Sequence, residues 1–195
     1  MPNLFSLLNG ASVSMTYSFH TELSRIWQNA VALYGNGHTT AGPFPIDDEI
    51  PILQSCGISK IDVFDYAEDW CLHQEPDIMT FILVHYERWN YFTEVQKGKP
   101  SIKQLDPSTL PAKSEHAGGV AWLPRILPKT RAKLRGELPD EVMYGCGGDR
   151  QFFQLNNIHP AEFLRVVRNY DDDDQRIIDW VLTRKNSSSL SSSSI

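Results

Sequence analysis

The sequence predicts an all-α protein made of two related helical modules of about four helices each. Apolar residues recur at helical spacing in several segments, and no alternating run bounded by turn residues predicts a strand. Segments 23–70 and 123–170 also resemble each other at a fixed offset. Together these observations predict a flexible N-terminal arm over 1–14, helical module 1 over 15–97, a linker over 98–118, helical module 2 over 119–184 and a disordered Ser-rich tail over 185–195.

Periodicity and stop signals predict the first two helices. Apolar residues between positions 19 and 34 recur at i, i+3, i+4 and i+7, the pattern of an amphipathic helix, and Gly35 ends it. Asp47 can act as the N-cap of a short second helix that continues to Cys56. Both helices would therefore bury one apolar face.

The next two helices are predicted mainly from their starts. Ser59 and Asp62 form a Ser-x-x-Asp pattern that resembles a capping box, with helical apolar spacing after it. Pro76 suits the first position of a fourth helix, whose apolar pattern continues to about Val95. Between 97 and 119, Pro and Gly recur at intervals that neither a helix nor a strand tolerates, which predicts an irregular linker.

The second module is expected to repeat this order. Six of the 48 paired positions are identical, against roughly three expected from average residue usage. The substitutions strengthen the match, because apolar residues replace apolar residues, as in Phe44 and Tyr144. Residues 174–182 would supply a shorter counterpart of the fourth helix. Pro128 disfavours helical geometry at Leu127, so the module's first helix could begin only there.

Composition restricts the class of protein. A chain of 195 residues with 41% hydrophobic content can bury a core without disulfides. A net charge of -6 makes nucleic acid an unlikely general partner. Three cysteines without a CxxC pair favour free thiols. No Lys or Arg precedes Arg25, as a secretory signal would require, and no apolar run could span a bilayer, so we expect a cytoplasmic protein without a membrane partner.

The most specific strings of the chain lie in the second module. They are Leu123-Pro124-Arg125, the run KTRAKLRG over 129–136, and Tyr144-Gly145-Cys146 with Asp149-Arg150. This part of the chain, roughly 119–182, resembles an uncharacterised bacterial family, domain of unknown function 5069. Longer members of that family have a leading region similar to 65–69 and 95–101. The resemblance implies a helical fold and brings with it no known activity, cofactor or catalytic residue.

The Gly-rich turn from Tyr144 to Arg150 is the sharpest local feature. Successive backbone N–H groups at Gly147 and Gly148, with Arg150, could bind an anion, and Cys146 is the candidate nucleophile of such a site. The turn matches neither a P-loop nor a dinucleotide fingerprint. The structural alternative is a tight connection in which the thiol simply packs as a small hydrophobe.

Histidine and acidic residues add few candidates. His159 could serve Cys146 as a base, but it precedes Pro160 at a helix start, where N-capping explains it better. His85 lies among apolar residues, and no metal-ligand spacing surrounds it, so we expect no metal and no cofactor. Three acids lie on one face of the same predicted helix, and we expect that face to be solvated: Asp62, Asp65 and Asp69.

A basic stretch distinguishes the second module from the first. It has five cations and no acid between 123 and 135, where the first module has only Arg25 between 23 and 35. We expect these charges on adjacent exposed faces, where they could receive phosphate, an acidic protein segment or local RNA. The structural alternative is that these cations pair with acids of the first module. The cations are Arg125, Lys129, Arg131, Lys133 and Arg135.

Function itself is unknown from the sequence. The leading hypothesis is a non-catalytic binding or interaction protein that uses the basic stretch, with an acidic protein segment or a phosphorylated small molecule as partner. The alternative is a cysteine-dependent enzyme that acts on an anionic small molecule at Cys146. The first needs a charged surface, whereas the second needs Cys146 and a histidine in one pocket.

Overall fold

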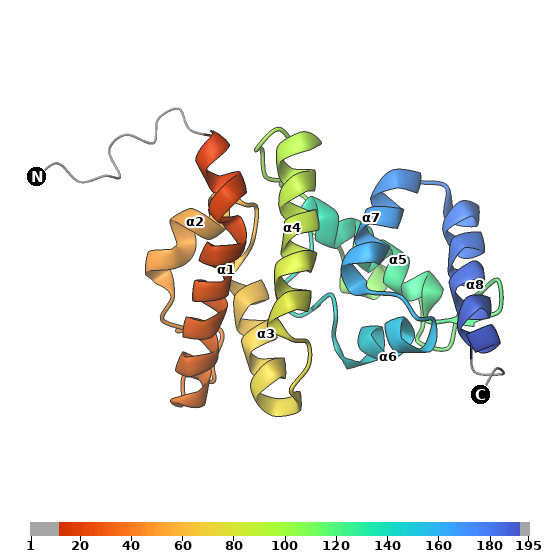
Figure 1. Ribbon diagram of the computed structural model, residues 1–195, viewed down its shortest axis with the longest axis horizontal. Coiled ribbons are helices and arrows are strands. Elements are labelled where there is room, and N and C mark those ends of the chain that lie inside the picture. The colour runs from red at the N-terminus through yellow and green to blue at the C-terminus, as the bar shows by residue number, and fades with distance from the viewer. Residues whose placement is uncertain (1–11, 192–195) are drawn as a thin grey trace, which may run out of the picture.

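The structure of the protein is a computed structural model that describes residues 12–191. Its regular secondary structure is almost entirely helical, which confirms the all-α class (Figure 1). The helices are α1 Ser12–Gly35, α2 Ile50–Ser55, α3 Lys60–His73, α4 Ile78–Glu94, α5 Leu123–Arg135, α6 Gly147–Leu155, α7 Pro160–Tyr170 and α8 Asp174–Ser191. Two 3-10 turns, η2 Asp47–Glu49 and η3 Pro107–Thr109, and one antiparallel pair of two-residue strands, β1 His116–Ala117 and β2 Val120–Ala121, complete it.

Helix α4 is the central element of the fold. Figure 1 shows α1, α2 and α3 on one side of it and the helices α5 to α8 on the other. Helix α1 packs against α3 and α4, and α4 packs in turn against α5 and α7. Since α4 contacts both halves, residues that face out from it toward the second half lie at the junction between the halves.

The buried core is continuous across the two halves. It includes Leu23 and Ile26 of α1 together with Ile126 of α5 and Phe163 of α7, each fully buried. The helices of the two halves come in the same order along the chain, but the last helix of each half packs differently. Helix α4 contacts α5 and α7 of the other half, whereas α8 packs on α7 of its own half. The internal duplication is therefore not confirmed.

Local capping signals predicted two helix starts well. In the capping box of α3, the Asp62 backbone N–H donates to Ser59 Oγ at 3.2 Å, and the Ser59 N–H donates to Asp62 Oδ2 at 3.3 Å. His159 caps α7, because its Nδ1 accepts from the Ala161 N–H at 3.2 Å. The capping interpretation of both residues is confirmed.

Several predicted boundaries were wrong. Helix α1 begins at Ser12, inside the expected arm, while residues 1–11 lie outside the described part of the chain. Helix α8 continues to Ser191, into the segment expected to be disordered, and 192–195 lie outside the described residues. Pro76 does not open α4, because Asp77 is the N-cap and accepts from the Thr80 N–H at 2.8 Å.

Pro128 lies inside α5 rather than at its start. The helix begins at Leu123, and the Trp122 carbonyl accepts from the N–H groups of Arg125 and Ile126. Proline lacks an N–H, so Pro128 removes only the bond to the carbonyl four residues earlier, in the first turn. The basic stretch is therefore one helix, and successive turns of it face different neighbours.

Candidate functional site

The central lysines of the basic stretch are buried. Lys129 is 3% exposed and Lys133 is 2% exposed. The expectation that they lie on exposed faces is therefore wrong. An ammonium group out of water needs a carboxylate and hydrogen-bond acceptors, because its desolvation otherwise costs several kcal/mol. Both lysines have a carboxylate partner, and the two partners come from different parts of the chain.

Lys129 lies beneath the Gly-rich turn. Its ammonium pairs with Asp149, whose side chain is fully buried. Asp149 also accepts from the Gly145 N–H and from Trp122 Nε1, both at 2.9 Å. At Gly148 an added Cβ would lie 2.4 Å from the Trp122 ring, so the absence of a side chain lets the indole reach Asp149. The buried ion pair and these hydrogen bonds to Asp149 together hold the turn in place.

Cys146 stands at the N-cap of α6 and is partly buried. Its Sγ accepts from Lys129 Nζ at 3.5 Å. The candidate base His159 makes different contacts, one to the Ala161 N–H and one to Thr80 Oγ1 at 3.4 Å. Neither of the two large cavities has Cys146 in its lining. The structure thus does not bring Cys146 and a histidine together in a pocket.

Lys133 reaches across the junction to α3. Its Nζ donates to Asp62 Oδ1 at 2.5 Å and lies 3.2 Å from Nε2 of the buried His85. The Phe81 carbonyl, 2.7 Å from His85 Nδ1, can only accept, so Nδ1 carries the proton and Nε2 accepts from Lys133. Burial and the Lys133 charge lower the pKa of His85 to about 3, consistent with a neutral ring.

The other predicted cations are partly buried and also engaged. Arg125 donates to the Pro111 carbonyl at 2.8 Å, and Arg131 pairs with Asp174. Arg135 interacts with Tyr91. Gly147 and Gly148, whose backbone N–H groups are the predicted anion site, form the first turn of α6.

The acidic face of α3 is part of the junction. Asp62 pairs with Lys133, and Asp69 pairs with Arg150, which also donates to the Gly145 carbonyl at 2.9 Å. The expectation of a solvated face is therefore wrong for Asp62 and Asp69. The alternative that paired the basic stretch with the acidic first module describes Lys133 correctly. It leaves Asp65 as the one of the three acids without such a partner among residues 12–191.

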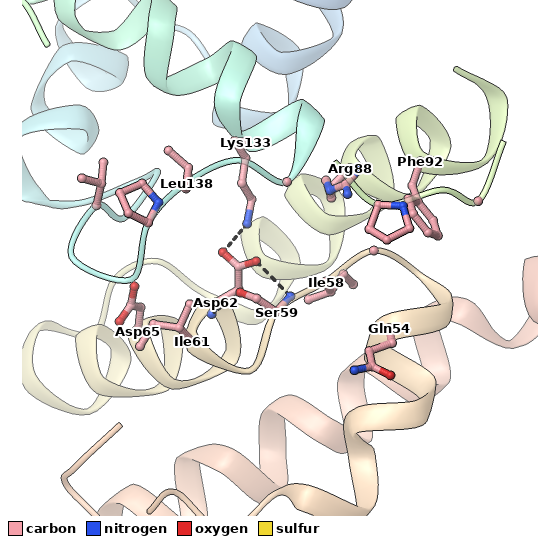
Figure 2. A pocket seen from close by; sticks show the side chains of 16 residues that line it. Gln54, Ile58, Ser59, Ile61, Asp62, Asp65, Arg88, Phe92, Lys133 and Leu138 are labelled. Carbon is pink, nitrogen blue, oxygen red and sulfur yellow. Dashed lines mark hydrogen bonds and ion pairs between the residues drawn. The ribbon is translucent and has the colours of Figure 1, made fainter. Parts of the chain in front are cut away.

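A cavity of about 540 Å³ opens beside these pairs, between α3, α4, the end of α5 and the loop after it (Figure 2). Its charged lining residues are Asp62, Asp65, Arg88 and Lys133. Its apolar lining includes Ile58, Ile61, Phe92, Leu138 and Val142. This size and mixed lining are typical of pockets for small molecules.

Arg88 is the exceptional residue of the cavity. It is 3% exposed, yet no carboxylate of the described residues lies within 4.0 Å of its guanidinium. Both of its hydrogen bonds come from Nη1, to Gln96 Oε1 at 2.7 Å and to the Leu134 carbonyl at 2.9 Å. Nε has no acceptor within the described chain. Burial lowers the pKa of Arg88 to about 10, which still leaves the group charged at neutral pH.

Two glycines make room for this guanidinium. An added Cβ at Gly57 would lie 2.8 Å from Arg88 Nη2, and one at Gly136 would lie 2.5 Å from the same atom. Both glycines have positive φ, +67° and +68°, so their backbones also favour glycine. On the other side, the Phe92 ring centroid lies 5.2 Å from the Arg88 guanidinium carbon. The guanidinium of Arg88 thus lies between glycine backbone on one side and an aromatic ring on the other.

Asp65 is the second unpaired charged residue of the cavity. We find no hydrogen bond or ion pair from its carboxyl to residues 12–191. Burial and the neighbouring Asp62, Glu68 and Asp69 raise its pKa to about 7, against the opposing effect of Lys133. At neutral pH it therefore exists in both protonation states, as acid–base groups of functional sites often do.

A second cavity, of about 630 Å³, lies between the start of α4, α6 and α7. Its arginines are already paired, Arg150 with Asp69 and Arg184 with Glu162, and the carboxylate of Asp77 caps α4. No group of three or more metal-ligating side chains in residues 12–191 could hold a metal ion. The cavity at Arg88 is therefore the better candidate for a site.

Sequence reasoning missed Arg88, although a signal was present. Arg88 falls on the same stripe of α4 as Phe81, His85 and Phe92, at steps of four, three and four residues, which is the buried face of a helix. A charged residue on such a stripe needs a partner, and the sequence near it offers none. That mismatch between position and charge is how the residue could have been found.

Comparison with known proteins finds a family resemblance in the second half of the chain. No curated protein and no solved structure matches the chain. None of the helices within residues 12–191 is long and apolar enough to cross a membrane. Residues 108–193 match the family model DUF5069, described as a domain of unknown function, which confirms the resemblance of this part of the chain to that family.

Proposed function

We propose that the protein binds a small organic molecule in the cavity between its halves and holds an oxyanion of that molecule, a carboxylate or a phosphate, on Arg88. The observation that carries the proposal is a buried guanidinium that lines a cavity and lacks a carboxylate partner in the described chain. Burial of an unpaired guanidinium carries a large desolvation free energy, and binding of an anion beside it would offset that free energy.

The geometry of the guanidinium fits this role. Nη1 makes both protein hydrogen bonds, so the edge formed by Nε and Nη2 is the one left over. An arginine edge with two parallel N–H groups matches the two oxygens of a carboxylate or phosphate. Because Gly57 and Gly136 have no side chains, their backbones can lie close beside Nη2. The Nη1 bonds to Gln96 and Leu134 hold the group in place before the ligand arrives.

The hypotheses drawn from the sequence have less support. Binding by the basic stretch would now rest on Arg125, Arg131 and Arg135, because Lys129 and Lys133 are buried and paired. The cysteine-dependent reaction at Cys146 lacks a histidine base, because the thiol contacts Lys129 and His159 contacts Ala161 and Thr80. Lys133 remains useful to the proposed site, since its pair with Asp62 forms one wall of the cavity.

Thermal unfolding in the presence of oxyanions tests the proposal. Sodium phosphate and sodium 4-methylpentanoate would be titrated at pH 6 against sodium chloride of equal ionic strength. At a ligand concentration of about 100 times Kd, binding stabilises the native state by about 2.7 kcal/mol, a rise in Tm of roughly 5–10 °C for a chain of this size. We expect a saturable rise in Tm with at least one of the two anions.

Matched variants identify the site. Arg88→Met should abolish the rise, whereas Arg176→Met, at a side chain that is 69% exposed, should keep it. If Arg88→Met proves too unstable to measure, Leu138→Trp can be used instead. This variant narrows the cavity without changing its charge and should reduce the rise in Tm. A saturable rise of equal size in Arg88→Met, or no rise in the wild-type protein, would contradict the proposal.

A further inference from the structure

The charges that line the cavity do not all need a ligand. Asp62 and Lys133 neutralise each other through a contact of 2.5 Å. With these two charges paired, one cation and one carboxyl of the lining have no ion-pair partner in the described chain, Arg88 and Asp65. Figure 2 shows these two side chains on different sides of the Asp62–Lys133 pair. A ligand that satisfied both would extend across that pair.

We infer that the ligand is amphoteric, with its oxyanion on Arg88 and an ammonium group on Asp65. This inference rests on the proposed function and adds to it the second recognition group. A ligand with an anion alone would leave Asp65 unsatisfied, and one with a cation alone would leave Arg88 uncompensated. Complementarity to both groups selects a molecule that carries both charges.

The remaining lining suggests the body of the ligand. Ile61 and Leu138 are apolar, and the Phe92 ring lies beside Arg88. An aliphatic or aromatic group can pack there, because burial of apolar surface is favourable in such a lining. The chemical class that combines these features is an amino-carboxylate whose ammonium and carboxylate are separated by an apolar chain, and a cavity of about 540 Å³ is large enough for it.

Proton release gives this inference a signature of its own. Asp65 faces Asp62, Glu68 and Asp69 on its own helix, Lys133 from α5 and, across the cavity, Arg88 from α4. At pH 7 a bound ammonium would favour the ionised carboxylate, so binding should release protons. A ligand with an anion alone would favour the protonated carboxyl and should take protons up.

Isothermal titration calorimetry at pH 7, in two buffers of different ionisation enthalpy, measures both affinity and proton release. The probes are 6-aminohexanoate, hexanoate, which lacks the ammonium, and hexylamine, which lacks the carboxylate. We expect 6-aminohexanoate to bind at least about tenfold more tightly than either analogue, as one charged hydrogen bond commonly provides. 6-Aminohexanoate should release protons, and hexanoate should take them up.

The variants separate this inference from the proposed function. Asp65→Asn should remove the preference for 6-aminohexanoate over hexanoate and abolish proton release, whereas the exposed Asp172→Asn should change neither. If hexanoate binds through Arg88 and 6-aminohexanoate binds no more tightly, the amphoteric ligand is refuted while the proposed function stands. If no probe, phosphate included, depends on Arg88, both are refuted.

Discussion

Asp65→Asn should stabilise the protein, and more so at pH 8 than at pH 5. The carboxyl has an ordinary pKa of 3.8, and burial beside other acids raises it to about 7 in the folded protein. One pKa unit corresponds to about 1.4 kcal/mol, so the ionised carboxylate destabilises the native state by up to about 4 kcal/mol. The partial exposure of the side chain reduces this to roughly 2 kcal/mol.

The sign follows from where the proton is lost first. Below pH 3.8 both states hold it, and Asp65 has no effect on stability. As the pH rises toward 7, only the unfolded chain releases its proton, so the wild-type protein loses stability. An asparagine cannot ionise and avoids that loss. The advantage of Asp65→Asn should therefore grow by about 1–3 kcal/mol between pH 5 and pH 8.

Urea unfolding followed by tryptophan fluorescence at the two pH values measures this difference. The control is Asp172→Asn, an exposed carboxyl in the turn before α8, whose effect should be the same at both pH values. An advantage of Asp65→Asn that stays constant, or that shrinks toward pH 8, would refute the account of a carboxyl buried without a partner.

Two further predictions concern the junction and the Gly-rich turn. Gly148→Ala should lower the free energy of unfolding by about 1–3 kcal/mol, because its Cβ meets the Trp122 ring. Gly147→Ala, with its nearest contact at 3.9 Å, should raise it by about 0.5–1 kcal/mol, and equal effects in urea unfolding would count against this packing. Lys133→Met should cost about 3–5 kcal/mol by leaving Asp62 unpaired, and Asp62→Asn in the same chain should restore part of it. A double variant as unstable as the sum of the single ones would show that no pair exists.

Local signals were sufficient for the starts of α3 and α7. The capping box at Ser59 and Asp62 and the cap at His159 depend on residues within three positions of one another, so the sequence contains all that determines them. Pro128 misled, because α5 extends from Leu123 to Arg135 with Pro128 inside it, so this proline does not mark the start of the helix. The extent of α8 could not be read from its Ser-rich composition either.

The candidate site depends on distant pairing that no local pattern contains. Lys133 meets Asp62 from 71 positions away, and a basic helix looks the same in sequence whether its charges are solvated or paired across a junction. Asp65 lies one helical turn from Asp62, and only the fold shows that one of them has a partner and the other does not. Arg88 alone carried a readable mismatch, a charge on the buried stripe of α4.

An anomalous diffraction experiment tests the role of Arg88 most directly. Crystals of the protein would be soaked at pH 6 in sodium selenate, a tetrahedral oxyanion whose selenium can be located without ambiguity. The account predicts a selenium peak in the cavity, with selenate oxygens within hydrogen-bond distance of Arg88 Nη2, and the loss of that peak in Arg88→Met. Selenate at surface cations with none in the cavity would contradict the account.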